Sequence, residues 1–330
     1  MTLSVALTAL ATALPLAPVG DFRQPVYATG AASQPRAVYV LERAGRVWRV
    51  GPRGGRRLVV DASRYVRLLE PHNQIGDQGG AFALALPART RAGGPLYLLY
   101  TRRDGRVHLD EFRRGRPRTL LSLRRTSRVD VGGDAVFGPD GLLYASFGYG
   151  RHPEASQDPR TLAGKVVRLD PRLPTARPDL VASGLRVPWR LSFDRRAGRR
   201  RLIVADVGEA GFEEVNLVPL DAAEPPNFGW PFFEGPRRRR PGGPADVAPP
   251  ALAKRHGRAT CAIVGGHLRR GRYVYGDVCS GRIRSVLLGD RRGRDDRSEH
   301  TTVPYLVSFG RDGAGRLYAV SLNGRVYRVG

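Results

Sequence analysis

A short sequence pattern occurs near both ends of this 330-residue chain and at several places between them. Residues 37–50 read AVYVLERAGRVWRV, and residues 315–329 read GRLYAVSLNGRVYRV. Each copy has an apolar segment, a polar turn that often contains Gly-Arg, and a second segment in which apolar and polar residues alternate. Alternation with a period of two beside a glycine-containing turn predicts an antiparallel β-hairpin. We therefore expect the chain to be built from repeated hairpin units.

Four further copies of the pattern lie between the two ends, beginning at residues 95, 142, 201 and 272. The copies are spaced by roughly 45 to 70 residues, which suits the four-stranded blade of a β-propeller. An open row of such sheets would expose unpaired strand edges, and closing the row into a ring removes them. The sequence thus predicts an all-β protein, a six-bladed β-propeller with four-stranded antiparallel blades around a central channel, whose first and last blades are neighbours.

The first 18 residues differ in composition from the rest of the chain. Residues 3–17 are apolar and rich in small side chains, a run that is too short to span a membrane and has the length of a signal-peptide core. Because no basic residue precedes this run, a lead-in to the first strand is the alternative interpretation. We expect such a segment over residues 1–18, one propeller domain over residues 19–330, no membrane span, and a secreted or periplasmic location.

Cys261 and Cys279 are the two cysteines of the chain. An even number of cysteines in an exported protein favours a disulfide, and the chain-entropy relation gives a loop of this length about 3 kcal/mol of stabilisation. Two buried free thiols are the alternative if the protein is cytosolic. The spacing is not that of a CxxC metal site.

The formal net charge is +25, and arginine supplies nearly all of the cations. The densest runs are residues 195–201 and 237–240, in loop-like or glycine- and proline-rich stretches. Charge of this size attracts polyanions through counterion release. No RNA-binding aromatic motif, recognition helix or zinc-finger spacing accompanies it. We therefore expect no specific nucleic-acid partner, and we keep a polyanion-binding surface as a third hypothesis for function.

Eight stretches, in the same order along the chain, resemble the soluble quinoprotein glucose/sorbosone dehydrogenases. They read VYVLERAGRVWRV, GDQGGAFALAL, GGDAVFGPDGLLYASFG, LAGKVVRLDP, GLRVPWRLSFD, ADVGEAGFEEVN, NFGWPFFEG and GRYVYGDVCSGRIRSV. The resemblance implies a six-bladed propeller that uses pyrroloquinoline quinone (PQQ) and calcium. It also implies oxidation of a sugar or polyol hydroxyl by hydride transfer to the quinone, followed by reduction of an external electron acceptor.

The Hedgehog-interacting proteins of animals are similar too, and they bind a partner without known sugar oxidation. Fold therefore does not decide function in this case. The alternative to a dehydrogenase is a non-catalytic propeller that binds a carbohydrate, a protein or a cell-envelope polymer. The resemblance leans towards an oxidoreductase.

The resemblance places Asp130 where the family's enzymes have a histidine as general base. A free Asp has a pKa of about 3.9 and a free His about 6.5, a difference of about 3.5 kcal/mol in proton affinity that handicaps Asp as a base near neutral pH. Burial beside Val129 and Val131 would raise the pKa of Asp130, and the nearby Arg186 would lower it. Asp130 is thus a candidate catalytic residue, with a turn or hydrogen-bonding role as the alternative.

Gln78 and Arg186 match family residues that line the cofactor pocket. A guanidinium at Arg186 would also stabilise negative charge on the reduced quinone, so Arg186 is a candidate for both catalysis and cofactor binding. The alternative is that GLRVPWR forms a turn at the start of a blade. Val187 stands where the family has an asparagine. Tyr149 replaces an acidic residue, and it either stacks on a planar ligand or fills the channel mouth.

Gly208 and Glu209 match a turn whose backbone carbonyls help to hold calcium in the family, so both are candidates for metal and cofactor binding. Carbonyl ligands suit a hard cation and leave little trace in a sequence. A surface loop with acidic caps at Glu209, Glu213 and Glu214 is the alternative. His72 is interpreted as a loop histidine, with a substituted general base as the alternative.

Overall fold

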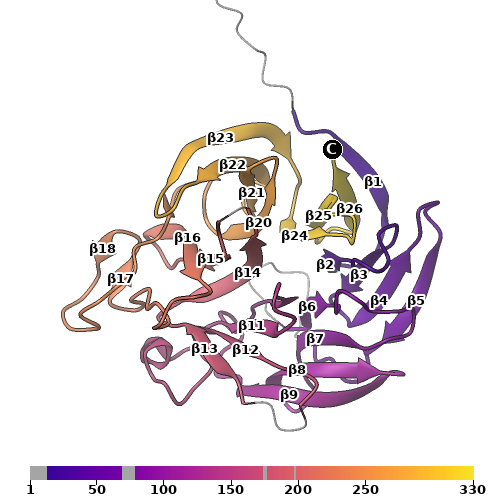
Figure 1. Ribbon diagram of the computed structural model, residues 1–330, viewed down its shortest axis with the longest axis horizontal. Coiled ribbons are helices and arrows are strands. Elements are labelled where there is room, and N and C mark those ends of the chain that lie inside the picture. The colour runs from indigo at the N-terminus through magenta and orange to yellow at the C-terminus, as the bar shows by residue number, and fades with distance from the viewer. Residues whose placement is uncertain (1–12, 69–78, 174–176, 197) are drawn as a thin grey trace, which may run out of the picture.

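Six four-stranded antiparallel sheets are arranged in a ring about a central axis in the computed structural model of the chain (Figure 1). The structure describes residues 13–330 except 69–78, 174–176 and 197. The single helix among the described residues is a short 3-10 turn, Pro153–Ser156. The predicted six-bladed, all-β propeller is therefore confirmed.

Five blades follow one another along the chain, each running from an innermost to an outermost strand. The first blade is β2 (Pro25–Thr29), β3 (Val38–Glu42), β4 (Arg46–Val50) and β5 (Arg56–Asp61). The second is β6 (Ala81–Ala85), β7 (Leu96–Thr101), β8 (Arg106–Arg113) and β9 (Arg116–Arg124), and the third is β10 (Ala135–Phe137), β11 (Leu143–Phe147), β12 (Lys165–Leu169) and β13 (Asp179–Ala182). The fourth is β14 (Val187–Asp194), β15 (Arg201–Val207), β16 (Phe212–Pro219) and β19 (Leu252–Arg255), and the fifth is β20 (Ile263–Arg269), β21 (Arg272–Asp277), β22 (Arg282–Leu288) and β23 (Gly293–Thr302).

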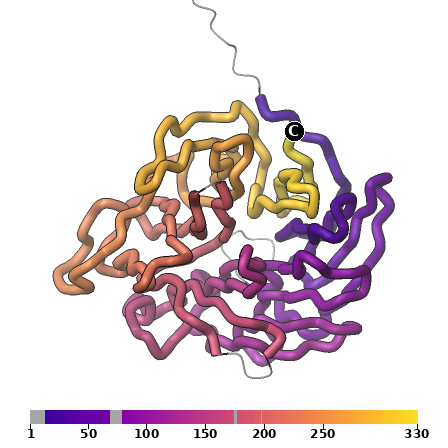
Figure 2. Tube along the Cα trace, in the orientation of Figure 1, coloured from indigo at the N-terminus to yellow at the C-terminus, as the bar shows by residue number. Residues whose placement is uncertain are grey.

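The sixth blade joins the two ends of the chain. It contains β24 (Leu306–Arg311), β25 (Leu317–Ser321) and β26 (Arg325–Val329), and its outermost strand is the N-terminal β1 (Leu16–Asp21). Leu16 pairs with Val329 and Asp21 pairs with Arg325, so β1 and β26 run side by side (Figure 2). The ring is closed by hydrogen bonds between these strands, so an N-terminal strand and a C-terminal strand hold the sixth blade together.

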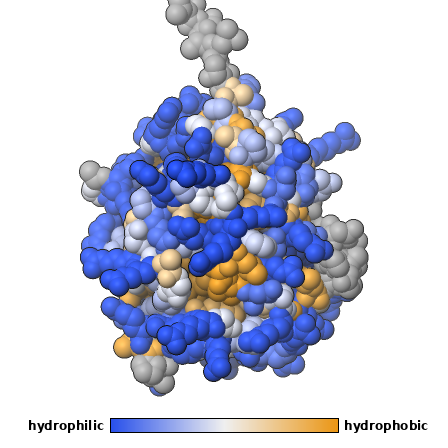
Figure 3. Space-filling view, turned by 90° about the vertical axis from the view of Figure 1, so that its right-hand side faces the viewer, coloured by the Kyte–Doolittle hydropathy of each residue, from blue (hydrophilic) through white to orange (hydrophobic). Residues whose placement is uncertain are grey.

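The middle strands of the blades form the core. All residues of β3, β7, β11 and β25 are buried, because neighbouring blades cover both faces of each sheet. The sequences of such strands are continuous apolar runs, as in LYLLYT of β7. The outer strands carry exposed arginines, and hydrophilic side chains cover much of the rim, with an apolar patch among them (Figure 3).

The glycines of the repeated pattern mark the hairpin turns. Gly45 between β3 and β4 has φ of 92°, and Gly324 between β25 and β26 has φ of 120°. A Cβ atom at Gly45 would lie 2.6 Å from a methyl group of Val66. The Gly-Arg turns in the sequence therefore correspond to positions where a side chain would be strained.

Cys261 and Cys279 form a disulfide with a Cα–Cα distance of 5.9 Å. It ties the segment before β20 to the turn after β21. Asp277 holds the same region, because its carboxylate accepts hydrogen bonds from the backbone N–H groups of Cys261, Cys279 and Ser280. The predicted disulfide is confirmed, and the alternative of two free thiols is wrong. None of the helices in the described ranges is long and apolar enough to cross a membrane.

Candidate functional site

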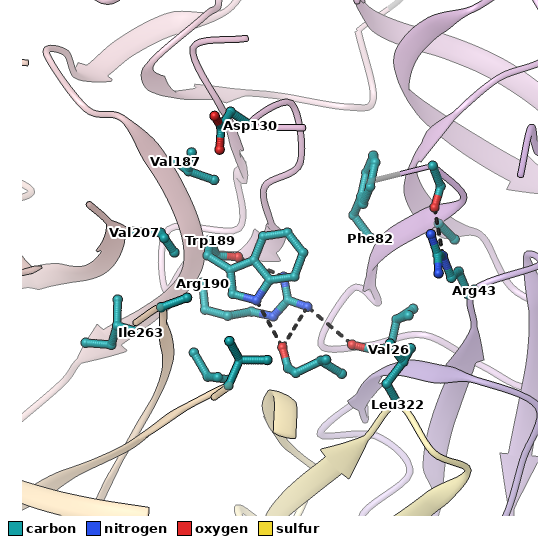
Figure 4. A pocket seen from close by; sticks show the side chains of 16 residues that line it. Val26, Arg43, Phe82, Asp130, Val187, Trp189, Arg190, Val207, Ile263 and Leu322 are labelled. Atoms are coloured by element: carbon teal, nitrogen blue, oxygen red, sulfur yellow. Dashed lines mark hydrogen bonds between the residues drawn. The ribbon is translucent and has the colours of Figure 1, made fainter. Parts of the chain in front are cut away.

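A cavity of about 130 Å³ opens at the end of the channel where the innermost strands begin (Figure 4). The lining is mostly apolar and comes from several blades. A dry cavity of about 150 Å³ holds one six-membered aromatic ring, so this space suits a single ring. The labelled lining residues are Val26, Arg43, Phe82, Asp130, Val187, Trp189, Arg190, Val207, Ile263 and Leu322.

The rings of Phe82 and Trp189 give the cavity aromatic walls. Trp189 is fixed in place, because its indole N–H donates to the carbonyl oxygen of Val307 at 3.0 Å. An indole anchored at its polar edge presents its apolar face to a ligand.

Arg190 forms the floor of the cavity beneath Trp189. Its guanidinium is buried and donates to the carbonyl oxygens of Trp189 at 2.8 Å and Val26 at 3.2 Å, and to the hydroxyl of Ser308 at 3.0 Å. Buried cations are tolerated when such partners replace water. Burial lowers the pKa of Arg190, and the nearby carboxylate of Asp134 opposes this shift. Sequence reasoning missed this residue, although an arginine inside the apolar stretch VPWRLSF was a signal for it.

Asp130 and Arg186 meet at the mouth of the cavity. Asp130 precedes β10 and has φ of 59°, and Arg186 immediately precedes β14. Arg186 Nη2 lies 3.1 Å from Asp130 Oδ2, and the two side chains are 12% and 18% exposed. Arg186 Nη1 also donates to the carbonyl oxygen of Val207 at 3.2 Å. The structure thus brings together two of the residues that the sequence singled out.

Burial raises the pKa of the Asp130 carboxyl, while the positive charge of Arg186 and a hydrogen bond from Tyr149 oppose the increase. The balance between burial and Arg186 was anticipated from the sequence, and burial is the larger effect. Asp130 is therefore a stronger base than a free aspartate.

Tyr149 fills space at the channel mouth. It is 9% exposed and packs edge-on against Trp230, with ring centroids 5.6 Å apart. The guanidinium of Arg186 lies 5.2 Å from the centroid of Tyr149 and 5.6 Å from that of Trp230. Of the two interpretations of Tyr149, the structure supports filling of the mouth. The pair of rings also holds Arg186 in place through cation–π contacts.

The turn that contains Gly208 and Glu209 joins β15 to β16. One oxygen of Glu234 accepts the backbone N–H groups of Glu209 at 2.7 Å, Gly211 at 3.0 Å and Ala210 at 3.1 Å. Within the described ranges, no group donates to the carbonyl oxygens of Gly208 or Glu209. The side chain of Glu209 pairs with Arg239. The turn therefore has uncommitted carbonyls, while its acidic side chain is engaged.

Glu213 and Glu214 are buried in β16, so their interpretation as caps of a surface loop is wrong. Glu213 accepts the backbone N–H of Ile263 at 2.7 Å and pairs with His256. Burial raises the pKa of Glu214 to about 7, and other buried carboxylates add to the increase. These residues satisfy donors inside the blades, which is why acidic side chains are tolerated there.

Asp206 lies between the buried glutamates of β16 and the mouth of the cavity. It accepts the backbone N–H groups of Arg186 at 2.9 Å and Val187 at 2.7 Å. Burial and the charge of Glu214 raise the pKa of Asp206 well above its usual range. The residue positions the turn that carries Arg186, and sequence reasoning did not identify it. Gln78 and His72 lie outside the described residues.

The arginine run at residues 237–240 lies on and after the hairpin of β17 (Phe233–Glu234) and β18 (Arg237–Arg238). Each of its four guanidinium groups lies 4.5–5.6 Å from the centroid of an aromatic ring, so the run is packed as well as charged. The pairs are Arg237 with Phe212, Arg238 with Phe233, Arg239 with Trp230, and Arg240 with Phe232.

Solved structures with the same fold include sugar dehydrogenases. The PQQ-bound aldose sugar dehydrogenase from Streptomyces coelicolor aligns with a TM-score of 0.77 and 19% identity, covering 96% of this chain and 97% of the other. A putative oxidoreductase (glucose dehydrogenase) from Thermus thermophilus aligns with a TM-score of 0.77 and 22% identity, covering 96% and 99%. At these identities the similarity shows the fold alone.

Curated relatives include a plant HIPL protein and the human Hedgehog-interacting protein. The HIPL1 protein of Arabidopsis thaliana is 28% identical over 271 residues, which is 60% of this chain and 38% of that protein. The human Hedgehog-interacting protein is 26% identical over 221 residues, which is 54% of this chain and 31% of that protein. The chain thus spans less than half the length of these relatives. The model of the family described as Glucose / Sorbosone dehydrogenase matches residues 27–240, and the chain therefore belongs to this family.

Proposed function

We propose that the protein oxidises a hydroxyl group of a sugar or polyol at the cavity mouth formed by Asp130 and Arg186, with PQQ as hydride acceptor and an external electron acceptor. The observation that carries the proposal is the convergence of this carboxylate and this guanidinium, 3.1 Å apart, over a ring-sized cavity with aromatic walls. The family and the PQQ-bound structural neighbour support it.

The residues present offer ligands for the metal ion and a cation for the cofactor, while the cavity itself has room for one ring and not for the three fused rings of PQQ. The uncommitted carbonyl oxygens of Gly208 and Glu209 are ligands of the kind that calcium prefers. Gly208 also tolerates no side chain, because a Cβ atom there would lie 1.9 Å from the carbonyl oxygen of Phe212. Arg186 is a cation at the mouth that suits an anionic oxygen. PQQ would supply the two-electron acceptor when bound.

Asp130 would act as the general base. Its carboxylate would accept the proton of the substrate hydroxyl. The hydrogen on the carbon that bears this hydroxyl would leave as hydride, with the electron pair of its C–H bond, so that a C=O bond forms. Arg186 keeps the carboxylate ionised and orients it towards the mouth. Asp206 positions this arginine by binding its backbone N–H.

A non-catalytic binding function is the second candidate, and the same ion pair favours it. A guanidinium that is already paired with Asp130 stabilises the negative charge of a reduced quinone less strongly. Val187, which is buried, also offers no polar group to a cofactor. In this case the aromatic walls and Asp130 would bind a sugar ring of a carbohydrate or a cell-envelope polymer without oxidising it.

The two candidates separate in a reconstitution experiment. Purified protein is loaded with PQQ and calcium, binding is followed by quinone absorbance, and turnover is followed by dye reduction with a panel of aldoses and polyols. We expect Asp130→Asn to lose turnover and retain PQQ, and Arg186→Ala to weaken both, whereas the exposed Asp246→Asn changes neither. Binding of PQQ without turnover of any substrate would favour the non-catalytic function. A lack of PQQ binding would exclude the dehydrogenase.

We also infer that the protein works outside the cytoplasm. The support is its disulfide between Cys261 and Cys279, since structural disulfides persist in oxidising compartments. Fractionation of the native host, followed by immunodetection, tests this location. Recovery of the chain with cytoplasmic markers would contradict it.

A further inference from the structure

A second cavity of about 510 Å³ lies at the other end of the channel. All six innermost strands, or the turns that follow them, contribute to its lining. The representative lining residues are Thr29, Leu86, Phe137, Phe193, His267 and Arg311. The first cavity is lined by the opposite ends of these strands, such as Val26 of β2 and Val307 of β24.

Arg190 and Tyr27 separate the two cavities. Arg190 lines the first cavity and Tyr27 lines the second, and the guanidinium lies 5.0 Å from the centroid of the phenol ring. Both side chains are buried, and Arg190 bonds to strands on several sides of the channel. A ligand in the second cavity would therefore not reach Asp130.

Two arginines at the second cavity lack a carboxylate partner. Within the described part of the chain, neither Arg195 nor Arg311 forms an ion pair with an acidic side chain; Arg195 lies 5.9 Å from the ring of Phe193, and Arg311 donates to the carbonyl oxygen of Leu268. The other charged groups of the cavity are neutralised. Arg196 is bound by Asp194 at 2.8 Å, and Asp312 is bound by Arg316 at 2.6 Å.

Arg311 carries a polar atom that nothing satisfies. Its Nε is buried and has no hydrogen-bond partner, and a buried donor without an acceptor costs about 1–3 kcal/mol. Burial and the like charge of Arg195 lower the pKa of Arg311. Burial and the charge of Arg311 also lower the pKa of His267 to about 3, so this histidine is neutral near pH 7. Among the described residues, the lining therefore combines two arginines that form no ion pair with an acidic side chain.

We propose that this second cavity binds a small metabolite through an oxyanion, a phosphate or carboxylate group, held by Arg195 and Arg311. A guanidinium presents planar N–H donors that match both oxyanions, and an anion would relieve the repulsion between the two arginines. The apolar side chains of Leu86, Phe137 and Phe193 line the same cavity and would contact the rest of the metabolite. This site is separate from the proposed oxidation site and does not depend on it.

Isothermal titration calorimetry with inorganic phosphate and, separately, with citrate tests the proposal on the full chain at constant ionic strength. We expect saturable binding of at least one probe at one site. Arg195→Gln and Arg311→Gln should each weaken it by ten-fold or more. Arg53→Gln removes the same charge from an exposed loop position and should leave binding unchanged, as should Arg186→Ala at the first cavity.

The two probes distinguish the sources of the oxyanion, because preference for phosphate indicates a phosphorylated metabolite and preference for citrate a carboxylated one. Since Arg195 is exposed, its variant is expected to fold even if Arg311→Gln does not. The proposal is overturned if neither probe binds saturably, or if Arg53→Gln weakens binding as much as Arg195→Gln does, which would indicate attraction to overall charge.

Discussion

Arg190 shows how much a single residue contributes to the centre of this propeller. Its guanidinium donates to groups on β2, β14 and β24, so one side chain joins three blades at the channel axis. We expect Arg190→Met to lower the free energy of unfolding by about 3 kcal/mol or more, because several buried acceptors would lose their donor at about 1–3 kcal/mol each. Chemical denaturation measures this change. Arg53→Gln, an exposed control, should stay within about 0.5 kcal/mol, and an equally small effect of Arg190→Met would refute the interpretation.

The raised pKa of Asp130 leads us to expect a specific pH dependence of catalysis. Burial raises its pKa, and a base must be ionised, so kcat/KM for sugar oxidation should fall as the pH drops through that raised pKa. Replacing Arg186 with glutamine removes a positive charge, and this should move the acidic limb of the profile to higher pH. The titration of the Asp130 carboxyl, followed by NMR in both proteins, should shift in the same direction. A limb that stays in place or moves to lower pH would contradict the assigned role.

At the scale of single elements, β16 contains two buried acidic residues, Glu213 and Glu214. Burial raises the pKa of Glu214 to about 7 from an ordinary value of 4.5, so the folded protein binds a proton that the unfolded chain has released in this range. Stability should therefore fall as the pH rises from about 4.5 to about 7. Glu214→Gln should flatten this part of the profile.

Thermal unfolding at pH 5 and pH 8 provides the test. The difference in Tm between the two pH values should shrink in Glu214→Gln and persist in Glu224→Gln, which changes an exposed glutamate. An unchanged difference in Glu214→Gln would show that this carboxyl is not responsible.

The sequence predicts the strands and turns better than it predicts the partners of buried polar side chains. The apolar runs and Gly-Arg turns predicted the hairpins, because period-two alternation and positive φ are local requirements. The burial of Glu213 and Glu214 could not be predicted, since their partners come from elsewhere in the chain, such as Ile263 and Gly235. The role of Asp206 was missed for the same reason, because it binds backbone N–H groups about twenty residues away.

At the scale of the whole molecule, the pairing of β1 with β26 closes the ring. The similarity of the two chain ends predicted that the first and last blades are neighbours, and the six blades follow from the number of repeated copies. The sharing of the last blade between both termini was not visible in the sequence, because hydrogen bonding between β1 and β26 leaves no pattern in either strand.

Deletion of residues 1–21 should therefore destabilise the entire propeller. It removes β1, exposes the edge of β26 and leaves the sixth blade with three strands, so we expect a lower Tm and a tendency to aggregate. Deletion of residues 1–12 retains β1 and serves as the control. Equal Tm values for the two truncated proteins would show that closure by β1 does not stabilise the ring.

A crystal structure of the protein with a bound aldose tests most directly whether the cavity at Asp130 and Arg186 is the functional site. We predict a sugar ring against Trp189, with one hydroxyl oxygen about 2.6–3.2 Å from a carboxylate oxygen of Asp130. A sugar bound elsewhere on the propeller, with the Asp130–Arg186 mouth empty, would contradict this assignment.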